Sequence, residues 1–133
     1  MRSINRITGV LAVAALALAC VATAGCAGTK AAYDAADTLE ERAFVATEHY
    51  SAVVRQAADL KDLGVLKGEP LAKAREIEFV AQPIVLSLGD LVAKFNAARS
   101  AETEVALQRA LDEAILAIAS LVRVVKGAAG DAT

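Results

Sequence analysis

Apolar residues recur at alternating steps of three and four along three segments of this chain, and this spacing constrains the fold more than any other feature. In a helix such steps place the side chains on one face, which must be buried against a neighbour. We call each series a seam. The seams comprise Ala36, Leu39, Ala43, Ala46, Tyr50, Val53, Ala57 and Leu60; then Ala74, Ile77, Ala81, Ile84, Leu88, Leu91 and Phe95; then Leu107, Leu111, Ala114, Ile118, Leu121 and Val125.

The three seams predict helices over residues 30–63, 70–98 and 101–126. Gly64 is placed to end the first helix, and Ser100 is placed to cap the start of the third. Because the connections between the segments are short, consecutive helices should run in opposite directions. The sequence therefore predicts an all-α fold, an up-down-up three-helix bundle. The third helix should be the most buried, because it contains a nine-residue run without charge.

Pro83 lies in the middle of the second predicted helix. An interior proline removes one backbone hydrogen bond and clashes with the preceding turn. The apolar spacing nevertheless continues past it in the same phase. We therefore predict a kink in the middle helix near residues 79–83, with two separate shorter helices as the alternative.

The composition fits helices and excludes one class of partner. Hydrophobic residues make up 56% of the chain, and it contains no Trp and only two Pro. Two of the fourteen basic residues, Arg2 and Arg6, lie at the N-terminus, which leaves twelve against sixteen acidic residues and a net charge of −4 for residues 26–133. Nucleic-acid binding needs concentrated Lys and Arg, so we expect no nucleic-acid partner.

The N-terminal segment has the pattern of a secretory signal. Two arginines precede Ile7–Gly25, a 19-residue apolar run without charge that has small residues near its end. The run ends in Thr-Ala-Gly-Cys at residues 23–26, which resembles the lipobox of bacterial lipoproteins. That resemblance covers residues 1–27 and implies cleavage before Cys26, acylation of its thiol and attachment to a membrane. It also implies the outer membrane of a Gram-negative host, because Ala27 replaces the Asp that commonly signals inner-membrane retention.

Two other outcomes fit the same leader. Ordinary signal cleavage would release a soluble exported protein. Without cleavage, 19 residues at about 1.5 Å each nearly match the ~30 Å hydrocarbon thickness and would form a single-pass anchor. With lipidation, the chain divides into a helical signal peptide (residues 1–25), a lipidated Cys and tether (26–29), a helical bundle (30–127) and a disordered tail (128–133). No cysteine then remains for a disulfide, so packing alone must hold the fold.

No set of residues in the sequence predicts catalysis, a metal or a cofactor. His49 is the only histidine, and one imidazole without thiols rarely holds zinc. We interpret it as an ordinary, partly exposed helix residue. The C-x-x-C-H motif of c-type haem proteins and the Glu-x-x-His pairs of di-iron bundles are both missing from the sequence. We therefore expect a protein that is not an enzyme.

Several large apolar residues are predicted to point away from the seams. Phe79 and Leu86 are seven residues apart and project nearly opposite the second seam, in line with Ala72 and Ala93. Tyr33 and Phe44 also stray from the first seam, as do Val105 and Leu116 from the third. One interpretation is a contact surface formed by Phe79, Leu86, Phe44 and Tyr33, for a partner or a second copy. The other is ordinary scattered surface residues, or burial caused by the Pro83 kink.

Two functions fit these patterns. The first is a non-enzymatic envelope lipoprotein with a structural or protein-interaction role, held to the membrane by its lipid. Residues 36–62 are weakly similar to small uncharacterised lipoproteins of bacteria and prophages, which implies a phage-linked role. The second is a periplasm-facing module in which the bundle opens around Pro83 and Gly89 to bind a small lipid-like molecule.

Overall fold

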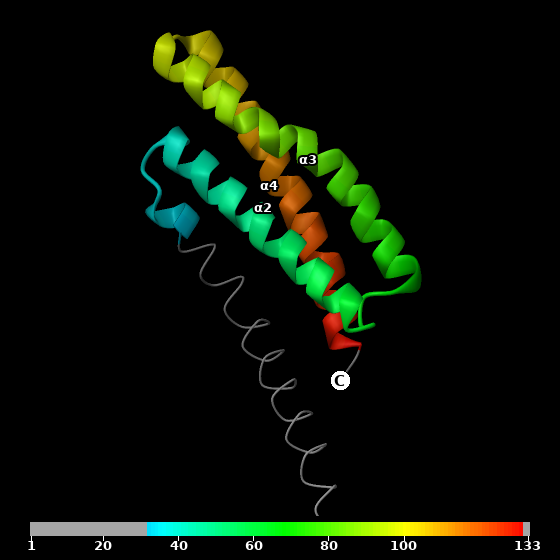
Figure 1. Cartoon of the computed structure of the whole chain (residues 1–133). Coiled ribbons are helices and arrows are strands. Elements are labelled where there is room, and N and C mark those ends of the chain that lie inside the picture. Colours follow the sequence, from blue (N-terminus) through cyan, green and yellow to red (C-terminus); the bar gives the residue numbers. More distant parts are fainter. Residues whose placement is uncertain (1–31, 132–133) are drawn as a thin grey trace, which may run out of the picture.

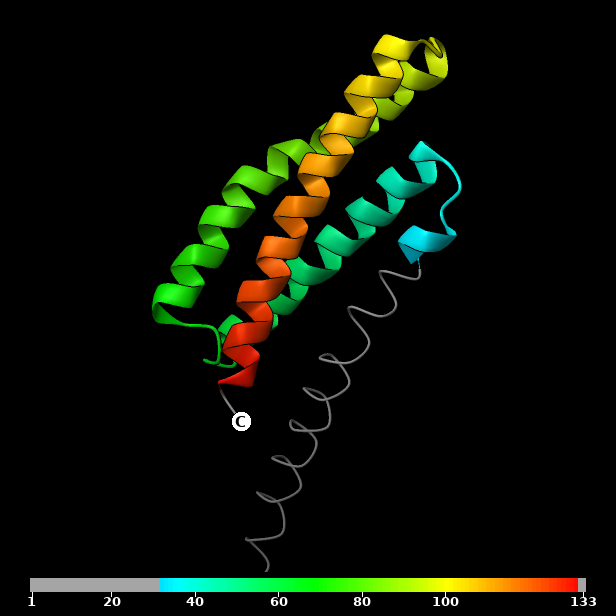
Figure 2. The ribbon, with the colours of Figure 1, turned by 180° about the vertical axis from the view of Figure 1, so that it is seen from behind.

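The computed structural model describes residues 32–131, in which every regular element is helical. Three long helices follow one another, α2 (Leu39–Asp62), α3 (Gly68–Ala97) and α4 (Ala101–Gly130). Consecutive long helices run in opposite directions, and each contacts the other two (Figures 1 and 2). The predicted all-α class is confirmed. The predicted signal peptide, Cys26 and the tether lie outside the described residues.

The seams form the core. Buried seam residues are Ala36, Ala43, Ala46, Val53, Ala57 and Leu60; Ala74, Ala81, Leu88 and Phe95; and all six residues of the third seam. The remaining seam residues, Leu39, Tyr50, Ile77, Ile84 and Leu91, are partly buried and pack against this core. Every third-seam residue is at most 1% exposed, which confirms that α4 is the most deeply buried helix. No charged or polar residue is fully buried in the described part of the chain.

The first long helix begins later than predicted. Residues 32–35 are helical, the chain leaves the helix at residues 36–38, and α2 starts at Leu39. The cause is a capping box: the Thr38 hydroxyl accepts a hydrogen bond from the Glu41 amide at 3.2 Å, and the Glu41 carboxylate accepts one from the Thr38 amide. Ala36 is buried just before the helix rather than within it. A predicted helix over 30–63 was therefore wrong at its start.

Gly64 ends α2 as predicted. It has φ of +72°, and its amide donates to the Lys61 carbonyl while the Val65 amide donates to the Leu60 carbonyl at 2.9 Å. These two bonds form a Schellman motif, which satisfies carbonyls at the helix end. The motif turns the chain so that Leu66, a loop residue, is buried at 1% exposure.

Helix α3 begins at Gly68, two residues before the predicted start, and runs unbroken across Pro83 to Ala97. The alternative of two separate shorter helices is therefore wrong. Pro83 is exposed, and it cannot donate the helical hydrogen bond that the Phe79 carbonyl would otherwise accept. Val85 joins the buried residues of α3 although it was not part of the predicted seam.

Helix α4 starts where predicted and ends later. The Ser100 hydroxyl accepts a hydrogen bond from the Thr103 amide at 3.2 Å, and Thr103 Oγ1 accepts one from the Ser100 amide. The helix passes Gly127 and continues to Gly130, although the tail was predicted to begin at residue 128. Ala128 is buried, so packing of its methyl group extends the helix past the glycine.

Candidate functional site

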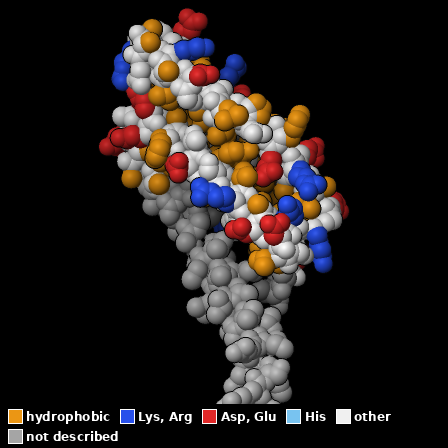
Figure 3. Space-filling model, in the orientation of Figure 1, with side chains coloured by type: hydrophobic (Ala, Val, Ile, Leu, Met, Phe, Trp, Pro, Cys, Tyr) orange, Lys and Arg blue, Asp and Glu red, His pale blue; other side chains and the backbone are white. Residues whose placement is uncertain are grey.

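The most prominent surface feature is the apolar outer face of α3. Phe79 is 82% exposed and Leu86 is 70% exposed, and Pro83 lies between them on the same face. Their exposure follows from helix geometry, because the opposite face of α3 carries the seam. Figure 3 shows that hydrophobic side chains alternate with charged ones on the face formed by α2 and α3. We call these two side chains, seven residues apart on one face of α3, the exposed ridge.

One exposed residue beside this ridge was not among the predicted contact residues. Val80, next to Phe79, is 55% exposed. The sequence contains an indication of this exposure. Val80 is adjacent to the outward-facing Phe79, and adjacent residues lie only about 100° apart around a helix. Val105 and Leu116 on α4 are also exposed, as their departure from the third seam predicted.

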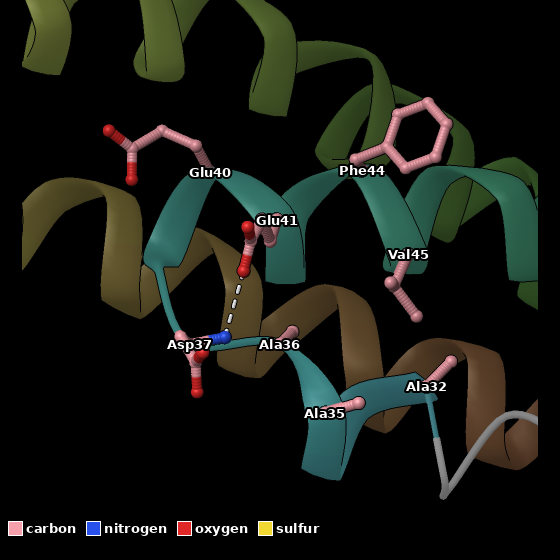
Figure 4. A pocket seen from close by; sticks show the side chains of 8 residues that line it. All are labelled: Ala32, Ala35, Ala36, Asp37, Glu40, Glu41, Phe44 and Val45. Atoms are coloured by element: carbon pink, nitrogen blue, oxygen red, sulfur yellow. Dashed lines mark hydrogen bonds between the residues drawn. The ribbon is translucent and has the colours of Figure 1, made fainter.

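Phe44 is exposed on α2 and borders an open hollow of about 510 Å³. The hollow lies in the angle between residues 32–35 and the first turns of α2, and its sides are Ala32, Ala35, Ala36, Asp37, Glu40, Glu41, Phe44 and Val45. Figure 4 shows the Glu41 carboxylate turned back to the Asp37 amide, a 2.8 Å hydrogen bond. That carboxylate therefore serves the helix cap, and the rest of the lining combines three alanines, Phe44 and Val45 with Asp37 and Glu40.

Tyr33 does not belong to an exposed contact surface, contrary to the sequence-based interpretation. It is partly buried, packs against the core, and meets the ring of His49 edge-on with centroids 6.3 Å apart. The break at residues 36–38 allows this, because it folds residues 32–35 back onto α2. Burial raises the pKa of Tyr33 to about 12. Of the four predicted contact residues, Phe79 and Leu86 share α3, Phe44 lies on α2, and Tyr33 is partly buried against the core.

His49 is partly buried, as expected for an ordinary helix residue beside the first seam. Burial lowers its pKa, and within residues 32–131 its Nδ1 atom has no hydrogen-bond partner. The Tyr33 hydroxyl is likewise buried without a partner among the described residues. The two rings thus form an aromatic contact in which neither polar atom is satisfied.

Within residues 32–131 no group of three or more His, Cys, Asp or Glu side chains lies close enough to hold a metal ion. None of the described helices is both long and apolar enough to cross a membrane. Cys26, the predicted lipidation site, lies outside the described part of the chain.

Comparison with known proteins returned no matching family model, no matching curated protein and no matching solved structure.

Proposed function

We propose that this chain is an envelope lipoprotein whose helical body acts by contact rather than by catalysis. The observation that carries the proposal is the order of residues 1–27: two arginines, an uncharged apolar run, then Thr-Ala-Gly-Cys. An apolar run inserts into the membrane while the arginines stay on the cytoplasmic side. Acyl chains on Cys26 would then hold the body at the membrane, because each buried methylene contributes about 0.8 kcal/mol.

The body is proposed to be an up-down-up three-helix bundle of α2, α3 and α4, with the middle helix bent at Pro83. Support comes from the buried seams on all three helices and from the proline inside α3. Such a body offers outer helix faces for binding a second copy of the chain or another envelope component. The exposed ridge of Phe79 and Leu86 is the surface best suited to that role, because large exposed apolar groups mark contact sites. The proposal includes a phage-linked setting, in which the body modifies a host cell surface; its support is the weak resemblance of residues 36–62 alone.

Metabolic labelling with palmitate tests the anchor. We expect the full chain expressed in a bacterium to incorporate label, and Cys26→Ser to incorporate none. Cys20→Ser is the matched control and should label like the unaltered chain, because Leu18 two residues before Cys20 makes it a poorer lipobox. An unlabelled chain, or label that persists in Cys26→Ser, would contradict the lipoprotein proposal.

Fractionation of a Gram-negative host tests the location. We expect the labelled chain in the outer membrane, and we expect Ala27→Asp to move it to the inner membrane. Ala27→Ser is the control and should leave the distribution unchanged. A labelled chain that stays in the inner membrane with Ala27 intact would contradict the proposed location while leaving the lipid anchor in place.

A further inference from the structure

The exposed ridge on α3 has the residue spacing of a coiled coil. Ala72, Phe79, Leu86 and Ala93 follow one another at steps of seven, and all four are exposed. Residues seven apart stay in line along a helix that supercoils around a partner at 3.5 residues per turn. We call these four residues the outer stripe. Its two large side chains lie at the centre and its two alanines lie at the ends, where a neighbouring helix can approach closely.

The charges beside the outer stripe decide how a partner helix would lie. Arg75 and Glu76 flank the stripe at about 50° to either side, for 3.5 residues per turn. Both are exposed, and neither forms an ion pair within residues 32–131. Asp90 lies on the same side of the stripe as Glu76, fourteen residues further along. The two sides of the stripe therefore carry opposite charge near Phe79.

We infer that the outer stripe binds a second copy of this chain, with the two α3 helices side by side and parallel. A two-fold axis along α3 brings each edge of the stripe against the opposite edge of the partner copy. Phe79 then meets Phe79 of the second copy, and Arg75 meets its Glu76 on both sides of the contact. In an antiparallel pair, Glu76 would instead lie beside Asp90 of the second copy, and the like charges would repel.

Membrane attachment favours the same orientation, and in this respect the inference rests on the proposed function. In a parallel pair both N-termini lie at the same end, so both chains can be anchored in one membrane. A single pair of helices buries less than the roughly 800 Å² per partner of a standard interface. Anchoring compensates, because confinement to one membrane raises the effective concentration of the two bodies.

Single-cysteine crosslinking of the full chain, extracted from membranes of an expressing bacterium, tests both the partner and its orientation. The sequence beyond Cys26 contains no cysteine, so an introduced thiol reports on its own position. We expect Ala72→Cys alone and Ala93→Cys alone each to give covalent dimers with a short bismaleimide. Ala119→Cys, exposed on α4, is the matched control and should give none above the unaltered chain.

Three outcomes would overturn the inference. If only a mixture of Ala72→Cys and Ala93→Cys chains crosslinks, and neither does so alone, the pair is antiparallel. If neither position exceeds the Ala119→Cys control, or if the stripe crosslinks to a different protein, the second copy is not the occupant. Palmitate labelling reports separately on the anchor, so failure of one test is distinguishable from failure of the other.

Charge exchange tests the flanking contacts. In the Ala72→Cys background, Arg75→Glu or Glu76→Arg should reduce the yield of covalent dimer severalfold. The double variant Arg75→Glu/Glu76→Arg should restore it, because each new pair is again oppositely charged. Arg109→Glu, at an exposed position on α4, is the control for net charge and should have no effect. A double variant that crosslinks no better than the two single ones would contradict the proposed Arg75–Glu76 contact.

Substitution of the central pair tests the apolar contact. Phe79→Ser/Leu86→Ser should abolish dimer formation while leaving the helix content by circular dichroism unchanged, because both side chains are exposed in the single chain. Leu116→Ser, equally exposed on α4, is the matched control and should leave crosslinking intact. Unchanged dimer yield in the double serine variant would contradict the inference.

Discussion

The guanidinium of Arg99 lies 2.8 Å from the carboxylate of Glu40 and so joins the α3–α4 connection to the first turn of α2. The same guanidinium sits 5.0 Å from the centre of the Phe95 ring and donates to the Asn96 amide oxygen. Phe95 is the last seam residue of α3. Arg99 therefore connects the charged surface to the end of the core, at the end of the molecule where α2 begins.

Replacing Arg99 with Ala should lower the free energy of unfolding by only about 1 kcal/mol. An exposed ion pair contributes about 0.2–1 kcal/mol, and an exposed cation–π contact contributes about 0.5–1. The Arg99 side chain is 67% exposed, so water screens both interactions. Urea unfolding followed by circular dichroism measures the change, with Arg109→Ala as the control. A loss of about 3 kcal/mol would mean that the contact is far less screened than its exposure indicates.

Two leucines five residues apart on α4 should respond very differently to truncation. Leu111 is 1% exposed, and Leu111→Ala should cost about 2–5 kcal/mol through lost burial and the cavity left behind. Leu116 is 70% exposed, and Leu116→Ala should change the free energy of unfolding by less than about 0.5 kcal/mol. Urea unfolding of both variants provides the comparison. Similar costs at the two sites would contradict the assignment of the buried face of α4.

Two glycines should respond to alanine with opposite signs. Gly64 has φ of +72°, so Gly64→Ala should destabilise the chain by about 1–2 kcal/mol through backbone strain alone. Gly89 lies inside α3, where Gly89→Ala should stabilise by about 0.5–1 kcal/mol. At both positions an added Cβ meets no atom within 4 Å, so steric clashes do not contribute to the difference between the two variants. Thermal unfolding would reveal the sign; stabilisation by Gly64→Ala would contradict the Schellman ending of α2.

Acidification should weaken the fold through His49. Burial lowers its pKa below the ordinary 6.5, so the unfolded chain takes up this proton at a higher pH than the folded chain does. The free energy of unfolding should therefore fall as the pH drops through 6.5, and this contribution should level off below the folded pKa. His49→Gln should flatten the pH dependence between about pH 7 and 5. Nuclear magnetic resonance titration of the single imidazole gives the pKa directly, and a value at or above 6.5 would contradict the burial.

Alkali should weaken the fold through Tyr33. Burial raises its pKa from 10.0 to about 12. The neutral Tyr33 side chain therefore makes its full contribution to the free energy of unfolding below pH 10, and this contribution is lost as the pH rises towards 12. Tyr33→Phe should remove that loss. At neutral pH it should cost little, because the hydroxyl has no partner among the described residues. Burial and the Glu78 carboxylate raise the pKa of Tyr50 as well, so Tyr50→Phe is the comparison. Equal alkaline loss in Tyr33→Phe and the unaltered chain would contradict this account.

Much of the fold was predictable because apolar spacing reports directly on burial. All six third-seam residues are buried, and Gly64 and Ser100 terminate their helices as local chemistry dictates. The exposure of Phe79 and Leu86 followed from the same helical geometry. These features depend on interactions within a few residues or on one helical face, which a sequence displays.

The predictions were wrong where two sequence patterns indicated different structures, or where the outcome depends on contacts between residues far apart in the sequence. The apolar spacing runs through Ala36 into α2, and it concealed the Thr38–Glu41 capping box that stops the helix there. The contact of Tyr33 with His49 depends on the break at residues 36–38. The predicted helix had no such break, so the prediction placed Tyr33 on the outside of the bundle. Burial of Ala128 beyond Gly127 depends on how α4 packs against other helices, which residue spacing does not reveal.

The residues that hold α2 in place have a mechanical consequence. Its buried face consists of Ala43, Ala46, Val53, Ala57 and Leu60, whereas α4 buries three leucines, an isoleucine and a valine besides two alanines. Less apolar area per residue means weaker attachment, so α2 should detach at lower cost than α4. A pull applied from the N-terminal side loads α2 before the other two helices. Under tension α2 would therefore detach and unfold first, and the pair of α3 and α4 would unfold last.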